Sequence, residues 1–188
     1  MELHGEQRIS LGRQAVWDAL NDPGVLKSCI PMCESVEKDG DNEFRIAMMA
    51  AVGPVRARFK ATMKYAQVDA PRACTMVFEA QGGPAGFGKG DAKLTLAEDG
   101  PVTVLGYQVS AKVGGKLAQI GSRLVDAAAA KVADEFFARF NEVVVKARAA
   151  PADPGSLPVA APARRLPKVL IAIVVVAVLA LLAYLLRR

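Results

Sequence analysis

The sequence feature that most constrains the fold is an unbroken alternation of apolar and polar side chains over residues 55–64. Successive side chains of a β-strand point to opposite faces of a sheet, so this pattern predicts a strand with one buried and one solvated face. The buried face requires a second layer to cover it. The apolar positions are Val55, Ala57, Phe59, Ala61 and Met63, and the polar positions are Arg56, Arg58, Lys60, Thr62 and Lys64.

Turn-forming residues divide residues 1–147 into a strand, two short helices, six further strands and a long closing helix. Together these elements predict an α+β domain, in which an antiparallel sheet of about seven strands curls around the closing helix. The expected strands span residues 3–10, 34–38, 43–52, 55–67, 73–81, 87–97 and 102–112. The expected helices span 12–21, 23–29 and 115–147. One face of the last helix carries Leu117, Ile120, Leu124, Ala128, Val132 and Phe136 at helical spacing.

The C-terminal segment is an uncharged apolar run over residues 169–186. At about 1.5 Å per residue, a run of this length can cross a hydrocarbon core of roughly 30 Å. A buried core helix is the alternative, but the run has no polar face. The proline-rich residues 148–167 are typical of an extended linker. We therefore expect a folded domain over residues 1–147, a flexible linker over 148–167 and a single-pass transmembrane anchor over 168–188.

The location of the domain follows from its N-terminal sequence. Glu2, His4, Glu6 and Arg8 interrupt the first ten residues, so no apolar secretory signal precedes the domain. We expect the domain to face the cytoplasm from the inner membrane. The chain has a formal net charge of +5, yet residues 1–147 contain 18 Lys+Arg and 18 Asp+Glu. A folded part without a basic excess argues against a nucleic-acid partner.

Residues that could support catalysis or bind a metal are scarce. His4 is the only histidine, and the spacing of Cys29 and Cys33 does not fit a usual zinc site. The glycine-rich residues 82–90 lack the phosphate-loop register and precede a strand rather than a helix. We therefore expect no metal site, no covalent cofactor and no enzymatic activity.

Several side chains expected on the inner face of the sheet are small, including Ala50, Ala92 and Ala111. Small inward side chains either let the helix approach closely or leave a cavity, and the sequence leaves both possibilities open. A cavity lined by methionines and aromatic rings would suit an apolar ligand, with Tyr107, Gln119 or Ser122 as polar contacts. The residues expected to line it are Trp17, Leu26, Phe44, Ile46, Met48, Ala57, Phe59, Ala61, Met63, Met76, Phe78, Phe87, Tyr107, Val109, Leu117, Ile120, Gly121 and Leu124.

The outer face of the sheet is expected to carry a row of cations, Arg56, Arg58, Lys60 and Lys64. Two interpretations of this row remain open. It is either an ordinary solvated sheet face or a docking patch for an acidic partner or for lipid headgroups.

Four strings, found in the right order, resemble the carbon monoxide dehydrogenase G-subunit family of the START-like (SRPBCC) helix-grip superfamily. Phe136-Phe137 falls where that family closes its helix, and Met32 is a departure, because the family often has glycine after the preceding proline. The strings are VWDALNDPGVLKSCIP at 16–31, VGPVRARFK at 52–60, GFGKGDA at 86–92 and GGKLAQIGSRL at 114–124.

The resemblance implies a helix-grip fold that holds a hydrophobic ligand between its sheet and its last helix. It further implies that the chain brings a molybdenum-containing carbon monoxide dehydrogenase or a related hydroxylase to the membrane. The ligand would be a quinone, menaquinone or ubiquinone, to which that enzyme passes its electrons. Two alternatives remain open: a membrane scaffold for the enzyme that binds no ligand, and a small-molecule enzyme such as a cyclase, which the superfamily also contains.

Overall fold

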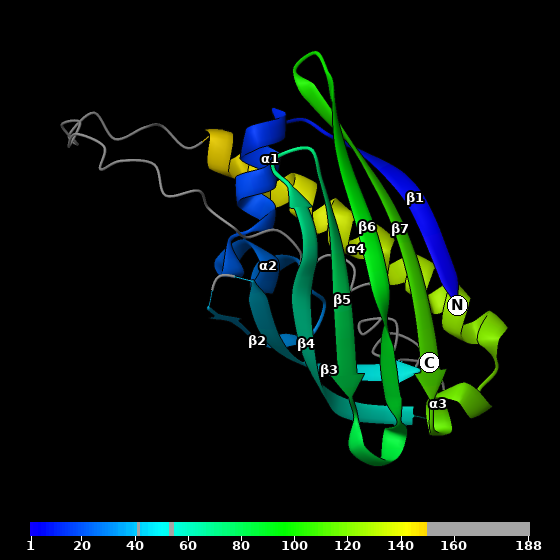
Figure 1. Cartoon of the computed structure of the whole chain (residues 1–188). Coiled ribbons are helices and arrows are strands. Elements are labelled where there is room, and N and C mark those ends of the chain that lie inside the picture. The colour runs from blue at the N-terminus through cyan, green and yellow to red at the C-terminus, as the bar shows by residue number, and fades with distance from the viewer. Residues whose placement is uncertain (41, 53–54, 150–188) are drawn as a thin grey trace.

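The computed structural model of the protein describes residues 1–40, 42–52 and 55–149. Seven strands, one short 3₁₀ turn (η1) and four helices follow one another along this part of the chain (Figure 1). The strands are β1 (Glu2–Ile9), β2 (Cys33–Asp39), β3 (Glu43–Val52), β4 (Val55–Asp69), β5 (Ala73–Gln81), β6 (Phe87–Asp99) and β7 (Val102–Gly114). The helical elements are α1 (Arg13–Leu20), α2 (Pro23–Cys29), η1 (Gly83–Ala85), α3 (Lys116–Gln119) and α4 (Ser122–Ala149).

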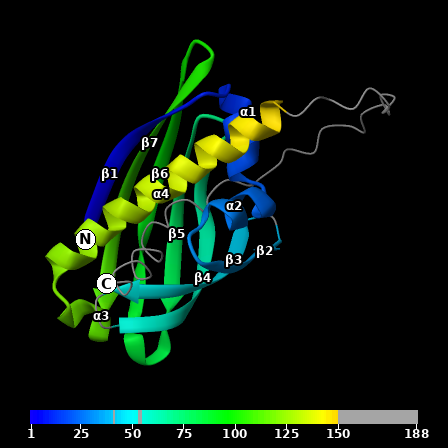
Figure 2. The same ribbon diagram turned by 180° about the vertical axis from the view of Figure 1, so that it is seen from behind.

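The strands form one sheet in the order β1-β7-β6-β5-β4-β3-β2, and every neighbouring pair is antiparallel. The sheet is strongly curved, and α4 runs diagonally across its inner face, with α1 and α2 on the same side (Figure 2). The helices thus cover one face and leave the other to solvent. This arrangement confirms the predicted α+β domain, in which a curved antiparallel sheet holds the closing helix.

The two short helices owe their boundaries to a capping residue. The Asp22 side chain accepts hydrogen bonds from the backbone N–H groups of Gly24 (2.7 Å) and Val25 (3.1 Å), and Pro23 occupies the first turn of α2. Such a side chain satisfies donors that the first helical turn leaves without partners. Asp22 therefore begins α2 directly after Asn21, the C-cap residue of α1. Trp17 of α1 and Leu26 of α2 are both in the core.

The expected single helix over residues 115–147 is wrong in one respect. Its first turn is a separate short helix, α3, and the chain breaks at Gly121, whose φ of 99° lies outside the helical region. Glycine reaches positive φ readily because it has no Cβ. α4 then begins at Ser122 and continues to Ala149, two residues past the expected end.

The curvature of the sheet has a local cause at Gly90 on β6. A Cβ atom built on Gly90 would lie 2.0 Å from the backbone oxygen of Ser110 and 2.8 Å from Cα of Ala111, both on β7. No other residue type fits so close an approach of two strands. Gly90 thus bends β6 against β7 and turns the small inner side chains of both strands towards α4.

Met32, between α2 and β2, is the one non-glycine residue in the described part of the chain with positive φ, at 54°. This conformation favours glycine. Met32 adopts it with its side chain 47% exposed.

The expected linker and transmembrane anchor lie outside the described residues, apart from the last two residues of α4. Within the described part of the chain, no helix is both long and apolar enough to cross a membrane.

Candidate functional site

The inner face of the sheet, opposite α4, contains most of the residues expected to line a cavity. Twelve of the eighteen are buried. Ala57 and Tyr107 are half-buried and pack against the same core. The twelve are Trp17, Leu26, Phe44, Ile46, Met48, Phe59, Ala61, Met63, Met76, Phe78, Val109 and Leu117.

Strand register gathers the small inner residues into one patch, which the sequence pattern alone did not show. Ala61 on β4 lies opposite Ala80 on β5, and Ala80 lies opposite Gly88 on β6. In the next inner row, Gly90 on β6 lies opposite Ala111 on β7. The patch therefore crosses four adjacent strands at the end of the sheet where β5 ends, β6 begins and β7 ends. This end is called the α3 end below, because α3 follows β7 directly.

Small and large buried residues are also separated along α4. The first half of α4, next to α3, buries Ala128, Ala129 and Ala133, whereas the second half buries Phe136 and Phe140 among other large residues. Small helix residues and small sheet residues therefore lie towards the same end of the domain. Because interiors are close-packed, such a pairing either draws the two layers together or leaves room for an apolar guest.

Aromatic contacts join β7 to α4 near the middle of both elements. The Tyr107 ring on β7 stacks on Phe137 of α4 with ring centroids 5.3 Å apart, and Phe137 meets Phe136 edge-on at 5.4 Å. Tyr107 also lies over Gly5 of β1, where a Cβ atom would come within 2.5 Å of its hydroxyl oxygen. Stacked rings of this kind fix the helix against the sheet.

Four expected lining residues lie elsewhere. Phe87 is 38% exposed on the outer face, because Gly88 and Gly90 take the inward positions of β6 and alternation places Phe87 opposite to them. Its ring covers Gly114 of β7. Leu124 is 49% exposed, Gly121 is exposed and Ile120 is half-buried. All three surround the break between α3 and α4, where the sequence predicts a continuous helix.

The interior contains two buried thiols, Cys29 and Cys74, and two partly buried tyrosines, Tyr65 and Tyr107. Burial raises the pKa of the Cys29 and Cys74 thiols to about 12, and it also raises the pKa of the Tyr65 hydroxyl. Burial likewise raises the pKa of Tyr107, and Asp134 adds to the effect. All four groups keep their protons at neutral pH. Gln119 and Ser122, the other expected polar contacts, are exposed.

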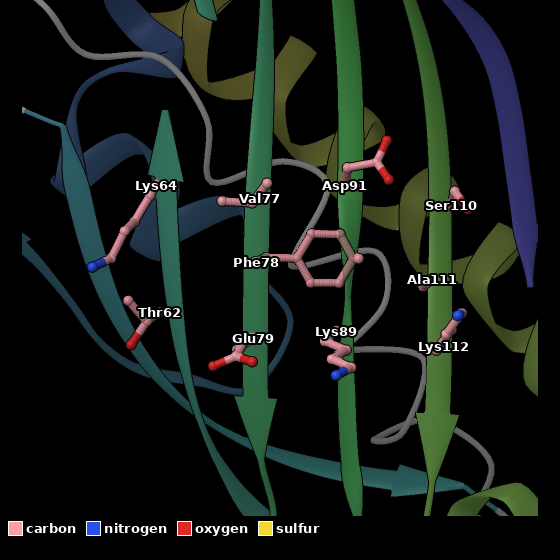
Figure 3. A pocket seen from close by; sticks show the side chains of 11 residues that line it. Thr62, Lys64, Val77, Phe78, Glu79, Lys89, Asp91, Ser110, Ala111 and Lys112 are labelled. Atoms are coloured by element: carbon pink, nitrogen blue, oxygen red, sulfur yellow. The ribbon is translucent and has the colours of Figure 1, made fainter. Parts of the chain in front are cut away.

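The outer face of the sheet carries a groove of about 490 Å³ over β4 to β7 (Figure 3). Its rim is charged and polar. The Phe78 ring, which is buried on the inner face, extends from β5 towards β6 at Gly90, between Lys89 and Asp91 (Figure 3). Residue alternation along β6 and β7 could have indicated these outward charges, but only the register brings them together. The groove is lined by Thr62, Lys64, Val77, Phe78, Glu79, Lys89, Gly90, Asp91, Ser110, Ala111 and Lys112.

The expected row of cations on β4 is only partly free. Arg58 pairs with Glu34 at 2.6 Å, and Lys64 pairs with Glu43 at 2.9 Å. The pairing raises the pKa of Lys64 through its hydrogen bond to Glu43. Exposed pairs of this kind contribute little to stability, but they neutralise two of the four cations.

No catalytic or metal site emerges from the described residues. They contain no group of three histidine, cysteine, aspartate or glutamate side chains that could hold a metal ion. His4 is exposed on β1. The outer groove and the interior between the sheet and α4 are two candidate ligand sites in the described part of the chain.

Comparison with known proteins identifies the fold and the family. A conserved protein from Geobacillus kaustophilus has a solved structure with a TM-score of 0.73 and 26% identity, covering 78% of this chain and 97% of that one. Two proteins resemble the chain in fold alone. One from Thermus thermophilus has a TM-score of 0.60 at 16% identity, covering 78% and 99% of the two chains. One from Mycobacterium smegmatis has a TM-score of 0.60 at 13% identity, covering 78% and 92%.

The search of curated proteins gave no match. The model of a protein family described as the G subunit of carbon monoxide dehydrogenase (CoxG) matches residues 5–145. That range runs from β1 into the last turns of α4 and so includes nearly the whole described domain. The chain therefore belongs to the carbon monoxide dehydrogenase G-subunit (CoxG) family.

Proposed function

We propose that the domain binds a hydrophobic ligand, most simply a quinone, between its sheet and α4. The observation that carries the proposal is the match of small residues across the interior. Ala61, Ala80 and Gly88 form a row on the sheet, and Ala128 and Ala129 lie on the half of α4 at the same end. Two surfaces of small side chains on the sheet and on α4 favour a space between them that an apolar molecule would fill.

The chemistry of the interior suits a ligand with a long apolar tail. Each buried CH₂ group gains about 0.8 kcal/mol on leaving water, so a prenyl tail gains more than a small polar headgroup loses. The Tyr107 hydroxyl keeps its proton at neutral pH because burial raises its pKa. It can therefore donate a hydrogen bond to a quinone carbonyl.

Family membership supports a partner as well as a ligand. The family is named for carbon monoxide dehydrogenase. We propose that the chain recruits a molybdenum hydroxylase of this type to the cytoplasmic membrane and helps pass its electrons to the quinone pool. The predicted anchor at residues 168–188 would hold the domain at the bilayer, and the predicted linker at 148–167 would let it move.

A second function follows from the burial of the same residues. Ala80 and Ala129 are fully buried, which a packed core without a ligand would also produce. In that case the chain would be a membrane scaffold for the enzyme, and no quinone would enter. The two functions differ in what an added side chain does to the interior.

The test replaces one of two neighbouring residues on β4 by phenylalanine. Ala61 is 3% exposed on the inner face, and Thr62 is half-buried on the outer face. Trp17, the only tryptophan, lies in the core at 1% exposure, so its fluorescence reports a quinone bound inside the domain. A short-chain ubiquinone analogue should quench it saturably at one molecule per chain. Ala61→Phe should abolish this quenching, and Thr62→Phe should preserve it.

Stability separates the scaffold from the ligand-binding protein. If a cavity is present, the phenylalanine of Ala61→Phe fills it, and the free energy of unfolding changes little. If the interior is packed, overpacking costs about 1–3 kcal/mol. A large loss of stability together with no quenching in the wild-type chain would contradict ligand binding and favour the scaffold.

A further inference from the structure

The α3 end of the domain combines exposed apolar side chains with cations. Phe87 is 38% exposed and Leu124 is 49% exposed, and Ile120 between them in sequence is half-buried. Phe87 lies over Gly114, one residue before Gly115, which packs against Gly86 beside η1. These contacts bring the start of β6, the end of β7 and α3 to one end of the molecule, where Figure 1 shows them together.

Four exposed cations lie at the same end of the domain. Lys89 and Lys112 are directly opposite each other on the outer faces of β6 and β7, although like charges in such a pair repel. Lys116 is exposed at the start of α3, and Arg123 is exposed at the start of α4. Within the described residues, none of these four cations forms an ion pair. Glu79 on β5 lies directly opposite Lys89, and Asp91 lies two residues further along β6, both in the lining of the outer groove.

The opposite end of the domain is different. There the charges are mostly neutralised within the fold: Arg8 pairs with Asp99, Arg13 with Glu98 and Arg72 with Asp69. The domain thus has one end with unpaired cations and exposed apolar side chains, and another with compensated charges. Residues 1–147 have no net charge, so this is a separation of charge along the domain rather than an overall excess.

We propose that the α3 end is a docking surface for an anionic lipid bilayer, so that the interior of the domain opens towards the membrane. Phe87, Ile120 and Leu124 would enter the headgroup region, and Lys89, Lys112, Lys116 and Arg123 would contact acidic headgroups. Exposed apolar residues among lysines and arginines are the pattern of interfacial membrane binding. An acidic protein surface would use the cations but would not require exposed apolar side chains beside them. This inference rests on the proposed function, because the predicted anchor brings the domain to the bilayer.

The predicted anchor follows the end of α4 in the sequence, which limits how the α3 end can reach the bilayer. The chain leaves the domain at the end of α4, and 28 helical residues at about 1.5 Å each place that point about 42 Å from the α3 end. Residues 150–167 separate the described domain from the predicted anchor. A proline-rich segment of this length extends to about 56 Å, so it can run beside the domain while the α3 end touches the bilayer.

The test places a tryptophan at each end of the full chain. Phe87→Trp marks the α3 end, and Val68→Trp marks the opposite end of the sheet, where Val68 is 41% exposed near the end of β4. Bromine-labelled phosphatidylcholine quenches tryptophan only on close contact. In vesicles that also contain an anionic phospholipid, Phe87→Trp should be quenched and Val68→Trp should not. Trp17 is buried at 1% exposure, so it contributes the same background fluorescence in both variants.

Charge reversal tests the cations with a matched control. Lys89→Glu/Lys112→Glu should lower the vesicle affinity of the α3 end about fivefold for each cation lost, and raised salt should act in the same direction. Lys93→Glu/Lys38→Glu changes the net charge equally at exposed sites away from this end and should leave the quenching unchanged. The substituted lysines are exposed, so both double variants should fold, and thermal unfolding checks this.

Flotation of the chain with the vesicles at high salt, where the lysine and arginine charges are screened, reports the anchor separately. If the chain floats but Phe87→Trp is not quenched, or both tryptophans are quenched equally, the docking surface is contradicted while the anchor stands. If both charge reversals act alike, the assignment to these lysines is overturned.

Failure to float contradicts the anchor of the proposed function, and quenching of Phe87→Trp by added vesicles would then still support the docking surface. Loss of enzyme recruitment in Lys89→Glu/Lys112→Glu without any quenching at Phe87→Trp would identify an acidic protein as the partner and overturn the membrane assignment.

Discussion

The ring of Tyr107 on β7 stacks on the ring of Phe137 on α4, with centroids 5.3 Å apart and planes inclined by 27°. The same tyrosine ring occupies the space above Gly5 on β1, where a Cβ atom would meet its hydroxyl oxygen at 2.5 Å. One side chain therefore joins an edge strand, its neighbour and the closing helix. The contact fixes α4 against the sheet outside the patch of small residues, which lies at the α3 end.

Gly5→Ala should destabilise the domain through this contact. The new methyl group displaces the Tyr107 ring and weakens its stacking on Phe137, which is worth about 1 kcal/mol. In a Phe137→Leu background the same change should cost less, because the stacking is already lost. Equal effects of Gly5→Ala in both backgrounds, measured by urea unfolding, would contradict the role of the stacked pair.

Gly90→Ala should be among the most damaging single changes in the sheet. Its Cβ atom would come within 2.0 Å of the backbone oxygen of Ser110, and backbone cannot move aside as a side chain can. We expect a loss of about 3 kcal/mol or more, because overpacking here also flattens the bend between β6 and β7. Gly106→Ala, which meets only the Thr95 hydroxyl at 2.7 Å, should cost much less. Thermal unfolding of the two variants gives the comparison, and similar losses would argue against Gly90 as the source of the bend.

The buried thiols predict a loss of stability at alkaline pH. Burial raises the pKa of Cys29 and Cys74 from 9.0 to about 12 in the folded chain, so unfolded thiols ionise first as the pH rises. Their stabilising contribution is full below pH 9 and declines from there towards about pH 12. Between pH 9 and 10 each thiol should lower the free energy of unfolding by about 1 kcal/mol. In a Cys29→Ala/Cys74→Ala variant this decline should be smaller by about 2 kcal/mol, and an unchanged slope would show that other groups cause it.

Asp22 should account for the boundary between α1 and α2. Asp22→Ala removes the acceptor for the N–H groups of Gly24 and Val25 and should cost about 1 kcal/mol. Asp22→Asn keeps an acceptor oxygen and should cost only a few tenths of that value. Chemical unfolding distinguishes the two variants, and an equal loss for both would point to the charge of Asp22 rather than to its capping bond.

The sequence predicts the elements of this fold well because their signals are local. Alternation from Val55 to Met63 defines both faces of β4, and Asp22-Pro23 marks the boundary of the two short helices. The closing helix is predicted as one element, because helical spacing continues through Ile120 and Leu124. The break at Gly121 depends on a positive φ that the spacing does not reveal.

The candidate site can be predicted only in outline. Composition indicates that inner residues are small, but the patch from Ala61 to Gly88 exists because of the register between β4, β5 and β6. Register also places Lys89 beside Lys112, which the sequence separates by more than twenty residues. The inward position predicted for Phe87 is wrong, since its aromatic character suggests burial while alternation along β6 turns Gly88 inward instead.

The most direct test of the central proposal is the position of a bound quinone. An azido-quinone, photoactivated on the full chain and mapped by peptide mass spectrometry, should label inner residues of β4 to β7 such as Ala61 and Ala80, and the alanine half of α4 around Ala129. Excess unlabelled quinone and Ala61→Phe should both suppress that labelling, whereas Thr62→Phe should not. Labelling confined to the outer groove around Lys89 and Asp91, or labelling of the interior that neither competitor nor variant suppresses, would contradict a ligand held between the sheet and α4.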